Sequence, residues 1–130
     1  MTIDKKHAIF TLHRFSFLLL IAFWTTAGLS HFASPEKFVK MMPQYLPEPY
    51  LLNILAGIAE LVVVAGWLYK PTRKYATYFA IFLLVAFLSV HIYHVQIGYL
   101  PVQPDTPMWM LIARIPLQFL LMLWAWWHRE

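Results

Sequence analysis

Four long stretches of the chain are apolar on nearly every face, and most polar positions lie between them. They cover residues 15–32, 50–69, 75–97 and 108–127. About 20 apolar residues wound as an α-helix cross the hydrocarbon core of a bilayer, and a helix satisfies its own backbone groups there. A barrel strand would alternate apolar and polar residues instead. The pattern therefore predicts an all-α membrane four-helix bundle, with residues 1–130 forming a single transmembrane domain.

The loop between the first two spans predicts a short helix at the outer membrane interface. Ser34 is a suitable N-cap, Pro35 suits the first helical position, and Pro43 ends the run. Phe38 and Met41 then fall on one face, which we expect to point inward. Because prolines stiffen both outer loops, we favour packing over the bundle end rather than a moving lid.

The composition supports a membrane protein and excludes several other classes. Hydrophobic residues make up 61% of the chain and charged residues 12%, whereas soluble domains are about half apolar and about a quarter charged. The net charge is +4, but the basic residues form short clusters rather than the continuous stripe that nucleic acid requires. There is no cysteine, which excludes disulfides, iron–sulfur clusters and dithiol redox chemistry.

The basic residues also predict the orientation. Seven of them precede the first span, lie in the middle loop or follow the last span: Lys5, Lys6, Arg14, Lys70, Arg73, Lys74 and Arg129. The other two loops contain only Lys37 and Lys40. By the positive-inside rule, both termini and the middle loop are cytoplasmic. The first apolar stretch is long for a signal peptide, so we interpret it as a retained helix.

Polar side chains inside the predicted spans are the main candidates for a binding site, because they are costly in lipid and usually face the bundle interior. They are His31, Asn53, Glu60, His91, His94, Arg114 and Gln118. At about 1.5 Å per residue, all seven fall in the outer half of the membrane or at its midplane. On each of the last three spans they share one helical face.

Glu60 and Arg114 carry opposite charges and lie on different spans. One interpretation is a buried ion pair that holds the helices in register. The other is an outward-facing pocket in which the two charges bind the polar head of a ligand. Arg114 could instead extend outward to the interface.

A metal site is a weaker alternative. His91 and His94 are three residues apart and could face one cavity with His31 and Glu60. Haem would need His31 together with His91 or His94 as axial ligands. The cofactor is not determined by these patterns, and the histidines could equally be hydrogen-bonding partners within the bundle.

Several segments resemble a known family. They are residues 31–38, 42–43, 53–60 and 114–118, with Pro47 and Arg73. Their residues resemble the DoxX-like membrane proteins, most specifically in the glycine–glutamate element that ends at Glu60. The resemblance implies a four-helix bundle in a bacterial inner membrane. It also implies an association with redox complexes, such as a subunit of a thiosulfate:quinone oxidoreductase, or with the assembly of other membrane proteins.

Three functions remain in competition. In the first, the chain is a redox-linked accessory subunit that binds a quinone or similar amphiphile; we expect no catalytic activity of its own, except as part of a quinone-linked oxidoreductase. The quinone head would meet Glu60, His91 and Arg114, with its tail along Trp24, Leu84, Phe87 and Leu121. In the second, the chain is a chaperone that shields a partner membrane protein or another copy of itself through small residues at 27–28 or Gly57. The third is a small transporter, although no inverted repeat is visible.

Overall fold

The computed structural model describes residues 4–130, which form five α-helices and one short 3₁₀ helix. Four helices are long and apolar enough to cross a membrane. The elements in chain order are α1 (Lys5–Ala33), α2 (Pro35–Met41), α3 (Pro49–Leu68), η1 (Lys70–Thr72), α4 (Arg73–Ile97) and α5 (Met108–Trp127). The predicted all-α four-helix bundle is confirmed, and this part of the chain contains no β-strand.

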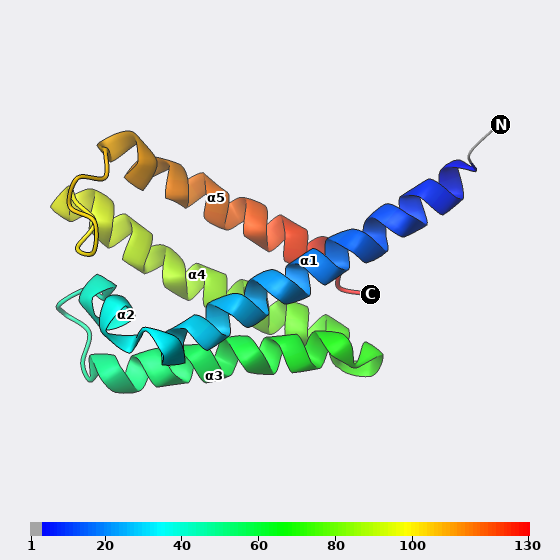
Figure 1. The fold of residues 1–130 in the computed structure, drawn as a ribbon, viewed down its shortest axis with the longest axis horizontal. Coiled ribbons are helices and arrows are strands. Elements are labelled where there is room, and N and C mark those ends of the chain that lie inside the picture. Colours follow the sequence, from blue (N-terminus) through cyan, green and yellow to red (C-terminus); the bar gives the residue numbers. More distant parts are fainter. Residues whose placement is uncertain (1–3) are drawn as a thin grey trace.

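The helix boundaries agree with the predicted spans within about two residues, except at the start of α1. This helix begins at Lys5 rather than at residue 15, because the side chain of Asp4 accepts a hydrogen bond from the backbone N–H of Lys6 at 3.1 Å. The first turns of α1 therefore project beyond the rest of the bundle (Figure 1). Hydropathy alone located the apolar part of the helix but not its polar N-terminal extension.

The short helix in the loop between the first two spans is also confirmed, with Pro35 in its first turn. Ser34 occupies the N-cap position, but its side chain makes no capping hydrogen bond. The hydroxyl of Tyr50 donates instead to the carboxylate of Glu36 at 2.7 Å, which ties α2 to the start of α3.

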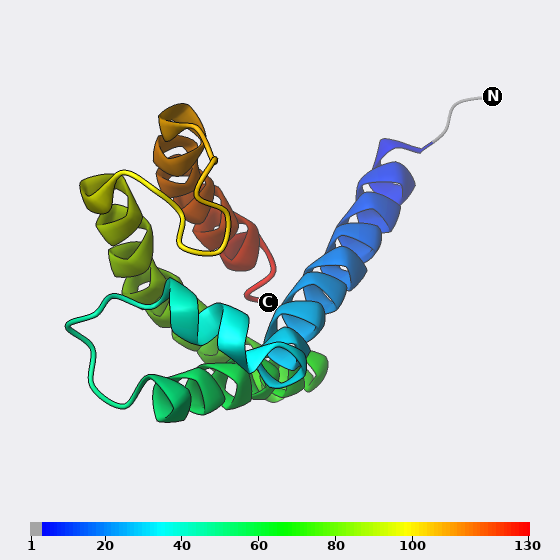
Figure 2. The same ribbon diagram turned by 60° about the vertical axis from the view of Figure 1, so that its left-hand side comes forward.

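The four long helices pack as a chain of neighbours: α1 against α3, α3 against α4, and α4 against α5. In Figure 1, α1 passes the C-terminal end of α5, and Figure 2 shows the two helices apart at the other end of α5. At the crossing, the indole N–H of Trp124 donates to the hydroxyl of Ser16 at 2.9 Å, and the ring of Phe23 lies 6.0 Å from that of Trp124. The bundle is thus closed at this end and wider toward the other.

Glycines allow α1 and α3 to approach closely. A Cβ atom added to Gly57 would lie 2.9 Å from Cβ of His31, and one added to Gly28 would lie 2.9 Å from Cδ2 of Leu61. At Gly57 the neighbour is a Cβ atom, which cannot move aside without its backbone, so the close approach of α1 and α3 there requires glycine. This contact brings His31 of α1 beside Glu60 of α3.

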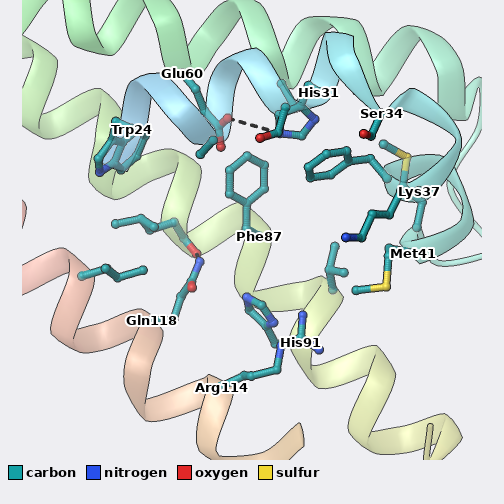
Figure 3. A pocket seen from close by; sticks show the side chains of 18 of the residues that line it. Trp24, His31, Ser34, Lys37, Met41, Glu60, Phe87, His91, Arg114 and Gln118 are labelled. Carbon is teal, nitrogen blue, oxygen red and sulfur yellow. Dashed lines mark hydrogen bonds and ion pairs between the residues drawn. The ribbon is translucent and has the colours of Figure 1, made fainter. Parts of the chain in front are cut away.

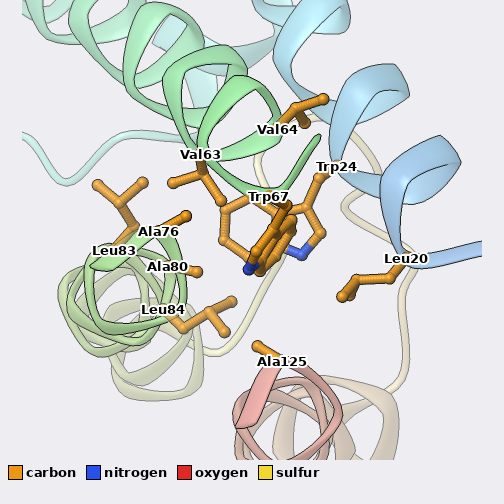
Figure 4. Close-up of a cluster of buried hydrophobic side chains, with 10 residues drawn as sticks. All are labelled: Leu20, Trp24, Val63, Val64, Trp67, Ala76, Ala80, Leu83, Leu84 and Ala125. Atoms are coloured by element: carbon orange, nitrogen blue, oxygen red, sulfur yellow. The ribbon is translucent and has the colours of Figure 1, made fainter. Parts of the chain in front are cut away.

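An apolar core fills the half of the bundle near the middle loop (Figure 4). Its centre is an edge-to-face pair of Trp24 and Trp67, whose ring centroids are 5.2 Å apart. The indole N–H of Trp67 donates to the hydroxyl of Thr77 at 3.0 Å. Val64 of α3 and Ala80 of α4 belong to this core.

The end of the molecule beyond this core is held by Arg73 and His128. The guanidinium of Arg73 donates to the carbonyls of Trp67 (2.9 Å) and Glu130 (3.3 Å), which links the middle loop to the C-terminus. The imidazole of His128 lies 3.0 Å from the hydroxyl of Ser16. Burial, with smaller contributions from the charges of His13 and Arg73, lowers the pKa of His128 to about 4. His128 is therefore neutral at pH 7.

Gly57→Ala should destabilise the protein by about 1–3 kcal/mol, because the new methyl group forces α1 away from α3. Denaturation of the purified protein in mixed micelles, followed by circular dichroism, measures this change. Ala65→Val, on an exposed face of α3, is the matched control and should be near neutral. Equal stability of Gly57→Ala and the wild type would show that the close contact is not required.

Candidate ligand-binding site

A cavity of about 470 Å³ lies in the wider half of the bundle (Figure 3). Helices α1, α3, α4 and α5 form its walls, while α2 and Val102 of the last loop cover one end. Its volume is within the range of about 300–1,000 Å³ that is typical of small-molecule sites. The apolar wall contains all four side chains expected to contact a ligand tail: Trp24, Leu84, Phe87 and Leu121.

The structure brings most of the predicted site residues together. Five of the seven line the cavity: His31, Glu60, His91, Arg114 and Gln118. Asn53 and His94 do not line it. They are buried directly behind it, where each forms a hydrogen bond to a lining residue. The cavity thus has a polar lining that is itself held by a second layer of buried polar side chains.

One wall carries the acid. Nε2 of His31 lies 3.2 Å from Oε2 of Glu60, and both side chains are 8% exposed. On its other side, the imidazole Nδ1 of His31 is 2.7 Å from Oδ1 of Asn53, while Nδ2 of Asn53 donates to the His31 carbonyl at 2.9 Å. The ring of Phe38, from α2, stacks on His31 with a centroid distance of 4.0 Å. His31 is therefore fixed on three sides.

The opposite wall carries the cation. Nη1 of Arg114 lies 3.2 Å from Nδ1 of His94, and Nε2 of His94 is 2.8 Å from the carbonyl oxygen of Met41. Since a carbonyl can only accept, Nε2 of His94 carries the proton and Nδ1 is free to accept from Arg114. His94 thus connects α5 to the end of α2 and holds the Arg114 side chain at the cavity.

The direct Glu60–Arg114 ion pair that the sequence suggested as one interpretation is not formed. Among the described residues, the ion-pair partner of Glu60 is His31, and Arg114 has no carboxylate within 4.0 Å. The two charges face the same cavity from opposite walls, with Phe87 between them (Figure 3). Glu60 pairs with His31 rather than with Arg114 because the close glycine contact joins α1 to α3. Helix α5, which carries Arg114, packs on the far side against α4.

Gln118 has a structural contact as well as a place at the cavity. Its Nε2 donates to the backbone carbonyl of Leu84 at 3.0 Å, which joins α5 to α4 near the deep end of the cavity. Pro116 lies inside α5, two residues after Arg114.

Buried polar atoms without a hydrogen-bond partner concentrate at the cavity. In residues 4–130 four such side-chain atoms occur, and three belong to lining residues: Nε1 of Trp24, Oε2 of Glu60 and Nδ1 of His91. The 3.2 Å contact with His31 does not satisfy Oε2, because it is not aligned as a hydrogen bond. Each buried group without a partner lowers the stability of the fold by about 1–3 kcal/mol unless a molecule in the cavity forms a hydrogen bond with it.

Two contributions to the cavity were not recognised from the sequence. Lys37 of α2 lines it, although the sequence indicated only an isolated loop charge. The signal was present, because Lys37 lies one helical turn before Met41, which also lines the cavity. The unpaired indole N–H of Trp24 was not foreseen, because Trp24 was assigned only to the apolar wall.

The metal and haem alternatives find little support in the arrangement of donor atoms. Within the described part of the chain, no three His, Asp or Glu side chains are close enough to hold a metal ion. Both ring nitrogens of His31 and of His94 are already in contact with protein atoms. This leaves neither of them a free nitrogen to serve as an axial ligand of haem.

Fold and site together define a helical multi-pass membrane protein with a cavity between its helices. Polar side chains line one part of this cavity and apolar side chains line the rest. Residues 20–129 match the model of a family described as a domain of unknown function (DUF8561), and the chain belongs to this family. No curated protein and no solved structure matches the chain. The family match includes every residue named in the two walls of the cavity.

A double-mutant cycle should identify the partner of Glu60. Removing one member of a buried pair costs about 3–5 kcal/mol because it isolates the other. We therefore expect His31→Phe and Glu60→Leu each to lower the free energy of unfolding. The double variant should lose about 1–3 kcal/mol less than the sum of the two single losses. The measurement is the free energy of unfolding in mixed micelles.

The control cycle combines Glu60→Leu with Arg114→Met. Because these side chains line one cavity without forming an ion pair, their coupling should be smaller than that of Glu60 with His31. A larger coupling for Glu60–Arg114 than for Glu60–His31 would contradict the assignment.

Proposed function

We propose that this protein binds a small amphiphile, such as a quinone, in its intramembrane cavity and acts as an accessory subunit of a redox system. The observation that carries the proposal is one cavity that combines charged and polar side chains (Glu60, His31, His91 and Arg114) with an apolar surface, and three of whose lining residues hold a buried polar atom without a partner. A polar head would supply the missing hydrogen bonds, and an isoprenoid or alkyl tail would cover the apolar wall.

The positions of the charges suit a quinone-type head. Arg114, held by His94, can donate to a ring oxygen from one wall, while Glu60 and His31 meet the head from the other. The tail would extend along Trp24, Leu84 and Phe87. Oxidation or reduction of the bound head needs an electron carrier, which a second protein would provide. The proposal is therefore for a binding subunit rather than an enzyme that acts alone.

A relationship to the DoxX-like proteins is part of this proposal. It is supported by the position of the resembling segments, because His31, Glu60, Arg114 and Gln118 all lie at the cavity. The same resemblance underlies the proposed location in a bacterial inner membrane.

The two other functions have less support. Gly28 and Gly57, whose neighbourhood was expected to bind a partner protein in a chaperone, are buried in the contact between α1 and α3. A transporter needs a path through the membrane, but the core around Trp67 fills the half of the bundle beyond the cavity. Neither function accounts for the unpaired polar atoms.

The orientation can be tested with single cysteines, because the chain contains none. Lys70 and Arg73 lie at the same end of the molecule as the C-terminus, to which Arg73 is hydrogen-bonded. This end is therefore proposed to be cytoplasmic. In intact cells, a membrane-impermeant maleimide should label Gln44→Cys, while Lys70→Cys should react only after lysis. The reverse pattern would place the cavity in the cytoplasmic half of the membrane.

The ligand can be identified by mass spectrometry of the lipids that remain with the protein after purification in mild detergent. We expect about one quinone or quinol per chain in the wild type. The amount recovered should fall at least tenfold in Glu60→Ala, because this variant lacks the carboxylate that would contact the head. Glu48→Gln, at an exposed residue in the first outer loop, is the matched control and should retain the ligand. Recovery of phospholipid alone from the wild type would contradict the proposal.

A further inference from the structure

The hydrogen bonds of Asn53 determine how His31 is protonated. Nδ2 of Asn53 lies 2.9 Å from the carbonyl oxygen of His31, and a carbonyl can only accept, so the amide nitrogen must face it. Oδ1 of the same amide then faces Nδ1 of His31 at 2.7 Å. Because that oxygen can only accept, Nδ1 of His31 carries a proton. Asn53 thereby directs Nε2, the other ring nitrogen, toward Glu60.

The contact between Nε2 of His31 and Glu60 requires one further proton. At 3.2 Å, an unprotonated nitrogen and an ionised carboxylate would present two lone pairs to each other. One proton therefore belongs to the pair, either on the imidazole or on the carboxyl group facing it. In both arrangements this proton lies on the side of His31. Glu60 consequently offers only lone pairs to the cavity.

We propose that the Asn53–His31–Glu60 chain makes Glu60 a dedicated hydrogen-bond acceptor, so that the cavity selects a hydroxyl-bearing head, such as a hydroquinone, over the corresponding quinone. This inference rests on the proposed function and specifies the form of the ligand. A hydroquinone hydroxyl can donate to Oε1 of Glu60, the oxygen turned away from His31, which receives no hydrogen bond from the described residues. A quinone oxygen can only accept, so it would leave Oε1 without a donor.

The other polar groups at the cavity are compatible with the same head. The indole N–H of Trp24 is an unpaired donor, and Lys37 and Arg114 carry further donors. A hydroxyl oxygen accepts as well as donates, so a second hydroxyl can receive a hydrogen bond from the opposite wall. Among the described residues, Glu60 is the one carboxylate that lines the cavity, so it is the lining side chain that can accept but not donate.

The affinity ratio of two ligands tests the inference. Decyl hydroquinone and decyl quinone, which share ring and tail, are titrated anaerobically into the full-length protein in detergent micelles. We expect the hydroquinone to bind the wild type at least tenfold more tightly, since a site that hydrogen-bonds a hydroxyl rejects an analogue without one. In Glu60→Gln the amide can also donate, and the two affinities should agree within about threefold.

A second variant tests the role of Asn53 as a positioning residue. Asn53→Leu keeps Glu60 but releases the His31 ring, and it should reduce the preference at least threefold. Its ¹⁵N spectrum should show loss of the protonated Nδ1 of His31, a change that lost packing alone would not produce. Glu48→Gln serves again as the control and should keep the wild-type ratio.

The possible outcomes separate the two proposals. Equal affinities in the wild type, or tighter binding of the quinone, would overturn the inference and leave the proposed function intact. Failure of both compounds to bind would overturn both. If Glu60→Gln does not fold, the wild-type ratio still decides whether the preference exists, and Asn53→Leu decides whether it depends on His31.

Discussion

The close contact between α1 and α3 is the constraint on which the rest of the structure depends. Gly28 and Gly57 let the two backbones approach until a single added methyl group would collide. In lipid, where apolar side chains gain little by leaving the solvent, such close packing is a main source of helix association. It places His31 against Glu60, and the carboxylate is accommodated inside the membrane because an imidazole lies 3.2 Å away.

The second consequence of this contact is the open side of the bundle. Because α1 packs along α3, its ring and hydrogen-bond contacts with α5 lie near the C-terminal end of α5, where Ser16 and Phe23 meet Trp124 and His13 meets Trp127. The tryptophan-centred core fills one half of the interior, and the other half remains as the cavity (Figures 3 and 4). A cation on α5 and an acid on α3 thus face each other without neutralising each other. Each of the two instead has a histidine as its neighbour, His31 for Glu60 and His94 for Arg114.

Buried histidines give the cavity its defined chemistry, and each acts through a different neighbour. His94 presents an unprotonated Nδ1 to Arg114, because its other ring nitrogen, Nε2, donates to the carbonyl of Met41. His31 has its orientation set by Asn53, which donates to one carbonyl and accepts from the ring. Neither histidine needs a metal to account for its burial. The residues behind the cavity wall are therefore as important to its properties as those that line it.

The sequence by itself determined the helices, their approximate ends and the face that each turns inward, because hydropathy and helical periodicity are local properties. It also placed Glu60, His91 and Arg114 at related depths, since helical rise converts position into depth. Only the tertiary structure decided that Glu60 pairs with His31 rather than with Arg114. Depth does not specify which helices are neighbours, and that choice depends on backbone approach at two glycines, a contact between residues about 30 positions apart.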